Sequence, residues 1–474
     1  MPINYYMSQE NPFLELFQKQ KVHQFKIGNT SHKERIDKLK RLQNTLEKTY
    51  KQDIREALYQ DFKKPHLETD LTEIYPVVDE IKFAISNLKS WLKHEKVAAP
   101  VSLLGSSSYI VNEPKGVCLI ISPWNYPINL TFAPLVSAIA GGNTVILKPS
   151  EMTPNTSKLM AKIVSNVFEE NEIALVEGEV ETASALLELP FNHIFFTGSP
   201  AVGKIVMKAA SKNLTSVTLE LGGKSPAIID DSSNLEKAVQ KIVYGKYTNA
   251  GQTCIAPDYV LIQESLKPDF IKLFKKEIQA FYSENPESSD SYSRIVNNKH
   301  FERLTNSLED AKQKGSVIES GGRTNASDCY MEPTLVSGLP EGATLMQEEI
   351  FGPILPLKTY KTIEEAVDYV NSNEKPLALY IFSKKNKVVD YVIQNTRAGS
   401  TCVNHNLLQF LNHNLPFGGS NNSGIGKSHG IFGFREFTNQ RSVLKQHTIG
   451  AVDLLMPPYT NWKQKLVDLT IKWF

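Results

Sequence analysis

Two potentially reactive side chains have neighbours that are unusual for their types. Glu220 lies in TLELGGKSP (218–226), where Leu219 and Leu221 flank it. Most glutamates are solvated, but apolar neighbours desolvate a carboxyl group and raise its pKa toward the range of a general base. Cys254 lies in NAGQTCIAPD (249–258), and a cysteine thiolate is an effective nucleophile. Composition alone leaves both roles open, because a cysteine is more often a small core residue.

A candidate phosphate-binding segment is FTGSPAVGKI (196–205), which follows an apolar run. Ser199 and Pro200 are typical of an N-cap and a first helical residue, so the segment predicts a helix over 200–211. The free N–H groups and positive dipole at its start would suit a pyrophosphate. An ordinary capped helix explains the same residues, so both interpretations stay open here.

Two other glycine patterns are rejected as nucleotide motifs. Gly198, Gly203 and Lys204 have the spacing of a Walker A loop, but Ile205 stands where a Ser or Thr hydroxyl must bind magnesium. The run 424–430 has its glycines in a polar loop that no expected strand precedes.

Short apolar runs alternate with helical patterns after residue 116, which predicts an α/β fold with parallel sheets. The expected strands are 117–122, 144–148, 193–197, 225–230, 259–263 and 378–382. The expected helices are 130–140, 156–168, 233–245, 265–282 and 363–372. Earlier in the chain, 31–96 has the pattern of amphipathic helices, 98–108 is looser, and YIVNEPKGV (109–117) reads as an extended arm.

The composition of the 474 residues excludes several classes of protein. A net charge of +1 gives no basic face for nucleic acid. Four cysteines in so long a chain are not typical of a disulfide framework. No pair of them has the CxxC spacing that would indicate a zinc site. The first residues lack a secretory signal, which favours a cytoplasmic location. The charge-free stretch 116–147 contains several Pro and Asn residues, so no transmembrane span is expected.

Seven motifs occur in an order that resembles the aldehyde dehydrogenase superfamily. They are SPWNYP (122–127), LKPSE (147–151), FTGSPAVGK (196–204), LELGGKSP (219–226), GQTCIAPD (251–258), EEIFGPILP (348–356) and LPFGGSNNSGIGKSHG (415–430). The resemblance covers roughly residues 20–445. The residues around Cys254 resemble those of the class 3, fatty-aldehyde-type branch of the family. Ser420-Asn421-Asn422 departs from the usual Val-Gly-Asn, which leaves the substrate range open.

The resemblance implies a role for each motif. Cys254 would be the nucleophile, Asn125 an oxyanion donor and Glu220 the base that activates the hydrolytic water. The remaining expected site residues bind the cofactor, NAD with NADP also admitted. These are Lys148 and Glu151 at the adenosine ribose, Gly198, Ser199 and Gly203 at the pyrophosphate, and Glu349 and Phe351 at the nicotinamide ribose.

The family fold implies a Rossmann-like cofactor domain, an α/β catalytic domain and a β-arm that supports a homodimer. The implied segments are helices of the cofactor domain (1–106), the first part of the arm (107–116), the cofactor-binding domain (117–224), the catalytic domain (225–415), a return to the cofactor domain with the second part of the arm (416–446), and an amphipathic tail (447–474).

The implied reaction is oxidation of a hydrophobic aliphatic or aromatic aldehyde to the carboxylic acid. Two alternatives stay open: a coenzyme-A-acylating relative, which the presence of Glu220 disfavours, and a non-catalytic binding protein on the same scaffold. His405 and His413 are interpreted as packing or surface residues. The chain length of the aldehyde, its pathway and the NAD to NADP ratio are not predicted.

The C-terminal stretch TNWKQKLVDLTIKWF (460–474) predicts an amphipathic helix too short to span a bilayer. Its apolar residues are Trp462, Leu466, Leu469 and Trp473. We expect this face to cover a dimer contact or the substrate entrance, and a weak contact with a membrane surface is the alternative.

Overall fold

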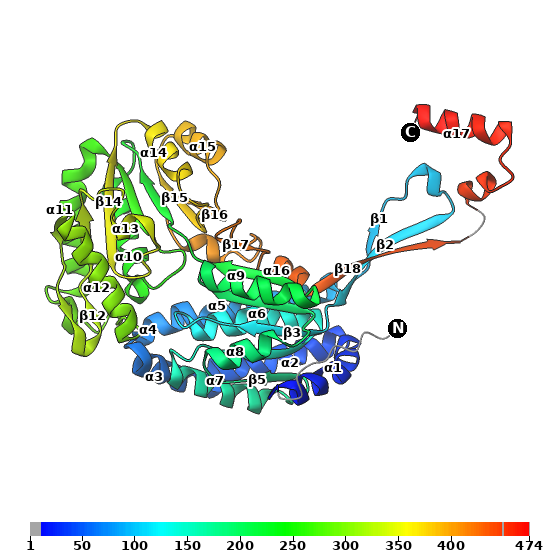
Figure 1. Cartoon of the computed structure of the whole chain (residues 1–474), viewed down its shortest axis with the longest axis horizontal. Coiled ribbons are helices and arrows are strands. Elements are labelled where there is room, and N and C mark those ends of the chain that lie inside the picture. The colour runs from blue at the N-terminus through cyan, green and yellow to red at the C-terminus, as the bar shows by residue number, and fades with distance from the viewer. Residues whose placement is uncertain (1–10, 448–449, 474) are drawn as a thin grey trace.

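The computed structural model describes residues 11–447 and 450–473. The first ten residues, on which the expectation of no secretory signal depends, lie outside these ranges, as do 448–449 and 474 within the predicted tail. Within the described ranges, no helix is long and apolar enough to cross a membrane. Two α/β bodies lie side by side, and a narrow arm projects from one of them (Figure 1).

The first body is built on a six-stranded sheet with the order β17-β7-β6-β3-β4-β5, parallel except for β17. Its strands are β3 (Val117–Ile121), β4 (Thr144–Lys148), β5 (Ile173–Leu175), β6 (His193–Gly198), β7 (Ser216–Leu221) and β17 (Gly424–Ile425). Helices α6 (Pro127–Gly141), α7 (Pro154–Val167), α8 (Val180–Leu187) and α9 (Pro200–Ala210) connect them. Every residue of β3 and β4 is buried, which explains their continuous apolar sequence.

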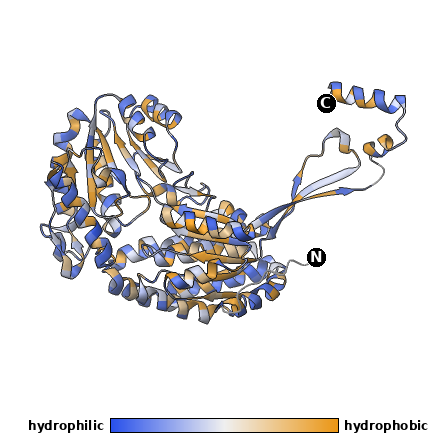
Figure 2. Cartoon of the chain, viewed as in Figure 1, coloured by the Kyte–Doolittle hydropathy of each residue, from blue (hydrophilic) through white to orange (hydrophobic). Residues whose placement is uncertain are grey.

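The N-terminal helices complete the core of this body. They are α1 (Leu14–Gly28), α2 (His32–Asn44), α3 (Lys51–Phe62), α4 (His66–Thr69) and α5 (Tyr75–Trp91), with π-helical turns at Thr45–Thr49 and Asp70–Ile74. Leu39, Leu42 and Leu46 have no exposed surface, whereas most charged residues of α2 are exposed. The predicted amphipathic pattern is confirmed, and Figure 2 shows the two faces as orange and blue.

The second body contains a seven-stranded sheet with the order β10-β13-β14-β9-β8-β15-β16, parallel except for β10. Its strands are β8 (Pro226–Ile229), β9 (Tyr259–Gln263), β10 (Val317–Ser320), β13 (Thr334–Ser337), β14 (Ile354–Tyr360), β15 (Ala378–Phe382) and β16 (Ser400–Val403). Its main helices are α10 (Leu235–Tyr247), α11 (Lys267–Tyr282), α12 (Asn298–Gln313), α14 (Ile363–Asn371) and α15 (Asn386–Asn395). The α/β class and the expected strands are confirmed.

Element boundaries differ from the expected ones where a local cap decides them. The helix expected from 130 begins at Pro127, because proline suits the first turn of a helix. The helix expected from 233 begins at Leu235, because the Asn234 side chain accepts from the N–H of Lys237 and acts as the N-cap. The stretch 31–96 is several helices that end at Trp91, followed by strand β1 (Glu95–Val97).

The arm is a three-stranded antiparallel sheet with the order β1-β2-β18. Strand β2 (Ser106–Pro114) pairs along its whole length with β18 (Thr438–Gln446), from Pro114 opposite Thr438 to Ser106 opposite Gln446. A short helix, α16 (Gly430–Glu436), leads from the first body into β18. Segments far apart in the sequence thus form one projecting element (Figure 1).

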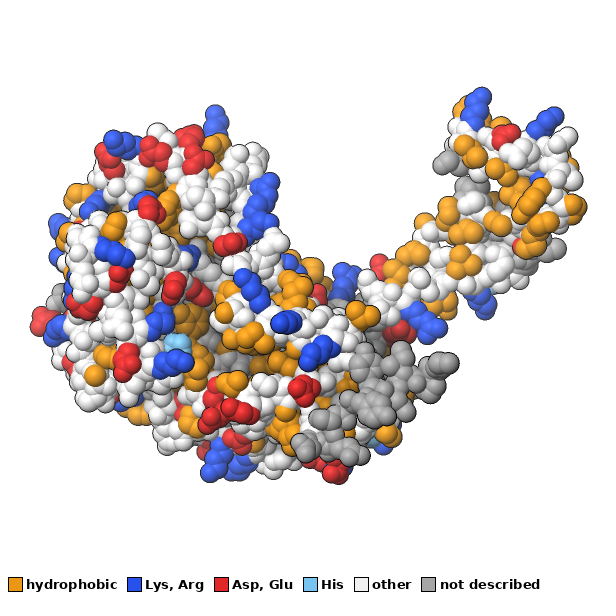
Figure 3. Space-filling model, in the orientation of Figure 1, with side chains coloured by type: hydrophobic (Ala, Val, Ile, Leu, Met, Phe, Trp, Pro, Cys, Tyr) orange, Lys and Arg blue, Asp and Glu red, His pale blue; other side chains and the backbone are white. Residues whose placement is uncertain are grey.

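The C-terminal helix α17 (Asn461–Trp473) lies beyond the end of the arm, away from both sheets (Figure 1). None of its residues is buried, and Trp462 and Trp473 are 54% and 69% exposed. The expectation that this helix covers the substrate entrance of its own chain is therefore wrong. The physical reason is its attachment to the projecting arm, where its apolar face and that of the arm lie open (Figure 3).

Candidate active site

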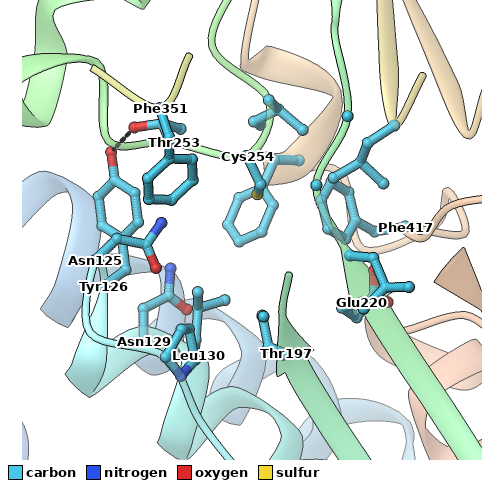
Figure 4. Close-up of a pocket in the computed structure, with 18 of the residues that line it drawn as sticks. Asn125, Tyr126, Asn129, Leu130, Thr197, Glu220, Thr253, Cys254, Phe351 and Phe417 are labelled. Carbon is cyan, nitrogen blue, oxygen red and sulfur yellow. Dashed lines mark hydrogen bonds between the residues drawn. The ribbon is translucent and has the colours of Figure 1, made fainter. Parts of the chain in front are cut away.

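A cavity of about 810 Å³ lies between the two bodies and receives side chains from both. Asn125 comes from the loop between β3 and α6, Glu220 from the end of β7, and Cys254 from the loop before β9. All three line this cavity, with their side chains arranged around it in Figure 4. The structure thus brings together three residues that the sequence places in separate motifs.

The backbone before Cys254 is strained. Asn249, Ala250 and Gly251 have consecutive positive φ angles of 54°, 51° and 74°. A side chain at position 251 would place its Cβ 2.3 Å from the carbonyl oxygen of Gly352, so only glycine fits there. Strained segments of this kind are typical of functional sites, where surrounding contacts hold them.

Side-chain amides hold this strained segment in place. The Gln252 Nε2 donates to the carbonyl oxygens of Asn249 and Arg294, both at 2.9 Å, and its Oε1 accepts from Val296 at 3.0 Å. The backbone N–H of Asn249 donates to Glu68 Oε1 at 2.9 Å. These buried bonds fix the chain on both sides of the turn that presents the Cys254 thiol.

Asn125 is tied to the same segment and is 2% exposed. Its side-chain Nδ2 donates to the backbone carbonyl of Gln252 at 3.0 Å. Its own backbone carbonyl accepts from Asn249 Nδ2 at 2.9 Å and from Lys64 Nζ at 3.2 Å. An amide nitrogen carries two N–H groups, so Asn125 keeps a donor beyond the one used by Gln252.

A buried ion pair lies behind the Asn125 loop. Lys64 Nζ and Glu73 Oε1 are 2.6 Å apart, and neither side chain has exposed surface. The other carboxylate oxygen of Glu73 accepts from the backbone N–H groups of Ile128 and Asn129, at the start of α6. This pair joins the loop of Asn125 to the first turn of the helix that follows it.

Glu220 is buried and held by one neighbour. Its Oε1 accepts from Ser428 Oγ at 3.0 Å, whereas its Oε2 has no hydrogen-bond partner within the described part of the chain. Burial raises the pKa of Glu220 to about 8, although the Ser428 hydroxyl and the charge of Lys427 oppose that shift. A carboxyl group with a pKa near neutrality and a free oxygen can accept a proton.

The electrostatics of the cavity keep the thiol protonated. Burial raises the pKa of Cys254 to about 12, and the negative charges of Glu349 and Glu220 add to this effect. Burial also raises the pKa of Glu349 to about 8. Ionisation of the thiol is therefore disfavoured until an added positive charge or hydrogen-bond donor stabilises the thiolate.

The expected nicotinamide-ribose residues line the same cavity. Phe351 has a φ of 47° and packs edge-on against Trp124, with ring centroids 5.3 Å apart. Glu349 lies against Gly222, where an added Cβ would be 2.0 Å from Glu349 Oε2. The glycine therefore gives this carboxylate room beside the end of β7.

The expected adenosine-ribose residues form an ion pair at the end of β4. Lys148 Nζ and Glu151 Oε2 are 2.8 Å apart, with Lys148 nearly buried and Glu151 much more exposed. They do not line the cavity that contains Cys254. A ligand contacting both regions must therefore extend past the carboxyl ends of the first sheet.

The expected pyrophosphate residues divide into two groups. Gly198 and Ser199 line the cavity, and the Ser199 hydroxyl caps α9 by accepting from the N–H of Val202 at 3.4 Å. Gly203 is buried, and an added Cβ there would be 2.8 Å from Leu221 Cδ2. The structure therefore gives Gly203 a packing role between α9 and β7.

Comparison with known proteins gives the family. The sequence model of the aldehyde dehydrogenase family matches residues 8–443. This chain belongs to the aldehyde dehydrogenase family. The 4,4'-diaponeurosporen-aldehyde dehydrogenase of Staphylococcus aureus is 44% identical over 90% of this chain and 92% of that protein. Aldehyde dehydrogenase family 3 member B1 of Rattus norvegicus is 43% identical over 87% of both chains.

A solved structure supports the same conclusion. The structure described as the substrate-bound state of Staphylococcus aureus AldH has a TM-score of 0.93 and 42% identity, and covers 96% of this chain and 99% of that one. The aldehyde dehydrogenase described here therefore oxidises an aldehyde with a nicotinamide cofactor. The resemblance to the class 3 branch is also confirmed, because family 3 members are among its relatives.

Several residues of this aldehyde dehydrogenase site lie within the quoted motifs but are not assigned an individual role by the sequence. Tyr126 and Thr253 hydrogen-bond through their hydroxyls at 2.6 Å and join the loops of Asn125 and Cys254 (Figure 4). Ser428, which holds Glu220, lies in the glycine-rich loop rejected as a nucleotide motif. Asn422, within the segment that departs from the family pattern, also lines the cavity.

Proposed function

We propose that this aldehyde dehydrogenase oxidises hydrophobic aldehydes to carboxylic acids through a covalent intermediate on Cys254. The supporting observation is that Cys254, Asn125 and Glu220 line one cavity whose wall is otherwise largely apolar. The apolar side chains of that wall include Trp124, Leu130, Phe351, Phe410, Leu411 and Phe417. Such a wall favours an aliphatic or aromatic substrate over a charged one.

In the first step, the Cys254 thiol loses its proton to water in the cavity, and the thiolate attacks the aldehyde carbon, so that negative charge develops on the former carbonyl oxygen. The backbone N–H of Cys254 and the second N–H of Asn125 Nδ2 donate to this oxygen. The bond from Asn125 to Gln252 orients the amide for this purpose. Glu349 and Phe351, which line the same cavity as Cys254, would hold the nicotinamide end of the cofactor, and that group would supply the hydride acceptor. Loss of the hydride from the substrate carbon leaves a thioester on Cys254.

In the second step, Glu220 removes a proton from the water that attacks the thioester. Its Oε2 is available for that water, while Ser428 holds Oε1. The products are the carboxylic acid and the free thiol. A carboxylate dedicated to water activation supports hydrolysis rather than transfer of the acyl group to coenzyme A.

We also infer a preference for NAD over NADP. Lys148 and Glu151 form the pair that would contact the adenosine ribose, and Glu151 is the more exposed of the two. A carboxylate accepts both hydroxyls of a ribose and repels a 2′-phosphate. Lys148 attracts that phosphate, so the preference is modest.

The arm supports a homodimer. β18 is an edge strand of nine residues, and no other described strand pairs with its outer side. Edge strands of this length need a cover or a partner, and a second copy of the arm supplies one through two-fold symmetry. Light scattering on the purified protein tests this assembly.

The covalent route is tested with Cys254→Ser. We expect this variant to bind cofactor normally and to lose turnover, whereas Cys402→Ser, which changes another partly buried free thiol of the same body, stays active. Mass spectrometry after rapid mixing with aldehyde and cofactor locates the acyl group. Near-normal turnover by Cys254→Ser, or an acyl group on another residue, would exclude the covalent role.

A further inference from the structure

Three buried side chains meet at a point that the oxidation reaction does not use. Glu80 comes from α5, His413 from the loop before β17, and His429 immediately precedes α16. Their exposed fractions are 2%, 8% and 8%. We infer that Glu80, His413 and His429 form a binding site for a divalent transition-metal cation of the zinc type.

The separations of the ligand atoms suit such an ion. Glu80 Oε2 is 2.7 Å from His413 Nδ1 and 3.7 Å from His429 Nδ1, and all three atoms lie within 4.8 Å of one another. Tetrahedral zinc with bonds of about 2.1 Å holds its ligand atoms about 3.4 Å apart. The observed distances bracket this value, so side-chain shifts of under about 1 Å complete the geometry.

The same three atoms lack other partners. Glu80 Oε2, His413 Nδ1 and His429 Nδ1 are buried, and none makes a hydrogen bond of acceptable geometry within the described ranges. Buried polar atoms are normally satisfied, and leaving one unpaired is costly. An ion pair between Glu80 and His413 accounts for two of these atoms but leaves His429 Nδ1 unexplained.

Surrounding groups orient the ligands as they do in protein metal sites. The remote nitrogen of His413, Nε2, lies 2.9 Å from Asp79 Oδ2, and a carboxylate on the far side of the ring is typical of a metal-bound histidine. Glu80 Oε1 accepts from the N–H of Gly430 at 2.9 Å, which leaves Oε2 for the ion. The His429 ring is held edge-on by Phe410, with ring centroids 4.6 Å apart.

The site opens into the substrate cavity. Glu80 and His429 line the cavity that also contains Cys254, so a fourth coordination position faces its interior. Water fills that position, or an oxygen atom of a molecule in the cavity replaces it. The cation therefore adds a polar anchoring point to an otherwise apolar wall and occupies space that bulky aldehydes need.

The test uses the full-length Cys254→Ser protein, because the catalytic thiol would itself bind thiophilic ions. After removal of metal with a chelator and dialysis, Co²⁺ is added as the spectroscopic probe and Zn²⁺ as the competitor. We expect one equivalent of Co²⁺ with visible absorption typical of tetrahedral coordination, and its displacement by Zn²⁺. Zn²⁺ should also raise the melting temperature of this protein, because a ligand that binds only the folded state stabilises it.

Matched variants in the same background locate the site. His429→Gln and Glu80→Gln should weaken Co²⁺ binding at least tenfold, and Asp79→Asn should weaken it by about tenfold through the orientation of His413. His405→Gln, which removes a histidine outside the cluster, should bind as its parent does. Melting curves without metal confirm that each variant is folded. Absence of stoichiometric binding, or equal binding by His429→Gln and its parent, would overturn the inference.

Discussion

The Asn125 side chain donates a 3.0 Å hydrogen bond to the carbonyl of Gln252, two residues before Cys254. Asn125 follows a strand of the first sheet, whereas Gln252 precedes a strand of the second. One hydrogen bond therefore joins the proposed oxyanion donor to the segment that carries the proposed nucleophile. A change in either loop moves both groups.

Glu220→Gln separates the two proposed half-reactions. The amide cannot accept a proton, so steady-state turnover should fall by about 10²–10⁴-fold, while the thioester on Cys254 accumulates. Mass spectrometry of the mixed protein detects this acyl enzyme. Ser428→Ala is the matched control: it retains the carboxylate, removes one hydrogen bond, and should lose far less activity. Normal hydrolysis of the acyl enzyme by Glu220→Gln would remove Glu220 from this role.

The same residue links pH to both rate and stability. Because burial raises the pKa of Glu220 to about 8, hydrolysis should increase with pH up to about that value. For stability, the folded-state pKa lies above the unfolded value of 4.5, so the contribution is fully present below about 4.5 and is lost as pH rises through about 8. Urea unfolding at several pH values should show a smaller loss over this range in Glu220→Gln.

Glu151→Gln should improve use of NADP relative to NAD. Removing one exposed charge near a 2′-phosphate is worth about 1 kcal/mol, or roughly fivefold in kcat/KM. Lys148 then interacts with the phosphate without its 2.8 Å competitor. The measurement is kcat/KM for both cofactors with one aldehyde. A strong NADP preference in the unmodified protein would already contradict the proposed role of Glu151.

The effects of replacing Lys64 and Glu73 on the free energy of unfolding should be strongly non-additive. Lys64→Met leaves the Glu73 carboxylate buried and unpaired, which costs about 3–5 kcal/mol in unfolding free energy. The double variant with Glu73→Gln should be more stable than the Lys64→Met single variant, because no buried charge remains. Urea unfolding of the four proteins gives the coupling. Additive effects would mean that the two groups act independently.

Truncation after Pro458 tests the C-terminal helix. Because α17 is exposed and lies beyond the arm, it can cover only the substrate entrance of a second copy of the chain. In that case truncation should change KM for long aldehydes much more than for short ones. If truncation instead releases the protein from anionic vesicles and leaves the kinetics unchanged for aldehydes of every chain length, the helix contacts a membrane.

Sequence patterns predicted those features that depend on neighbouring residues in the chain. The apolar runs of β3 and β4 and the N-cap Ser199 are explicit in the sequence, and the motifs around Cys254 and Glu220 singled out two residues that line one cavity. Contacts between distant segments could not be predicted. Glu220 and Ser428 are 208 residues apart, and nothing near Ser428 indicates its partner.

The position of the C-terminal helix could not be predicted from the sequence either. The periodic apolar residues of 460–474 indicated a helix with an unsatisfied face, and α17 forms there. Amphipathicity says that a face needs a partner, but it does not say where that partner lies. The arm decides the position, because the pairing of β2 with β18 carries the end of the chain away from the body.

The junction at Gly222 and Gly223 joins β7, which carries Glu220 near its end, to β8 of the second sheet, and Cys254 lies in the loop before β9 of that second sheet. Any rotation of one body against the other changes the separation between carboxylate and thiol. The Glu349 carboxylate leaves no space for a side chain at position 222. In the proposed mechanism, the relative position of the two bodies therefore sets how near Glu220 can bring a water molecule to the thioester on Cys254.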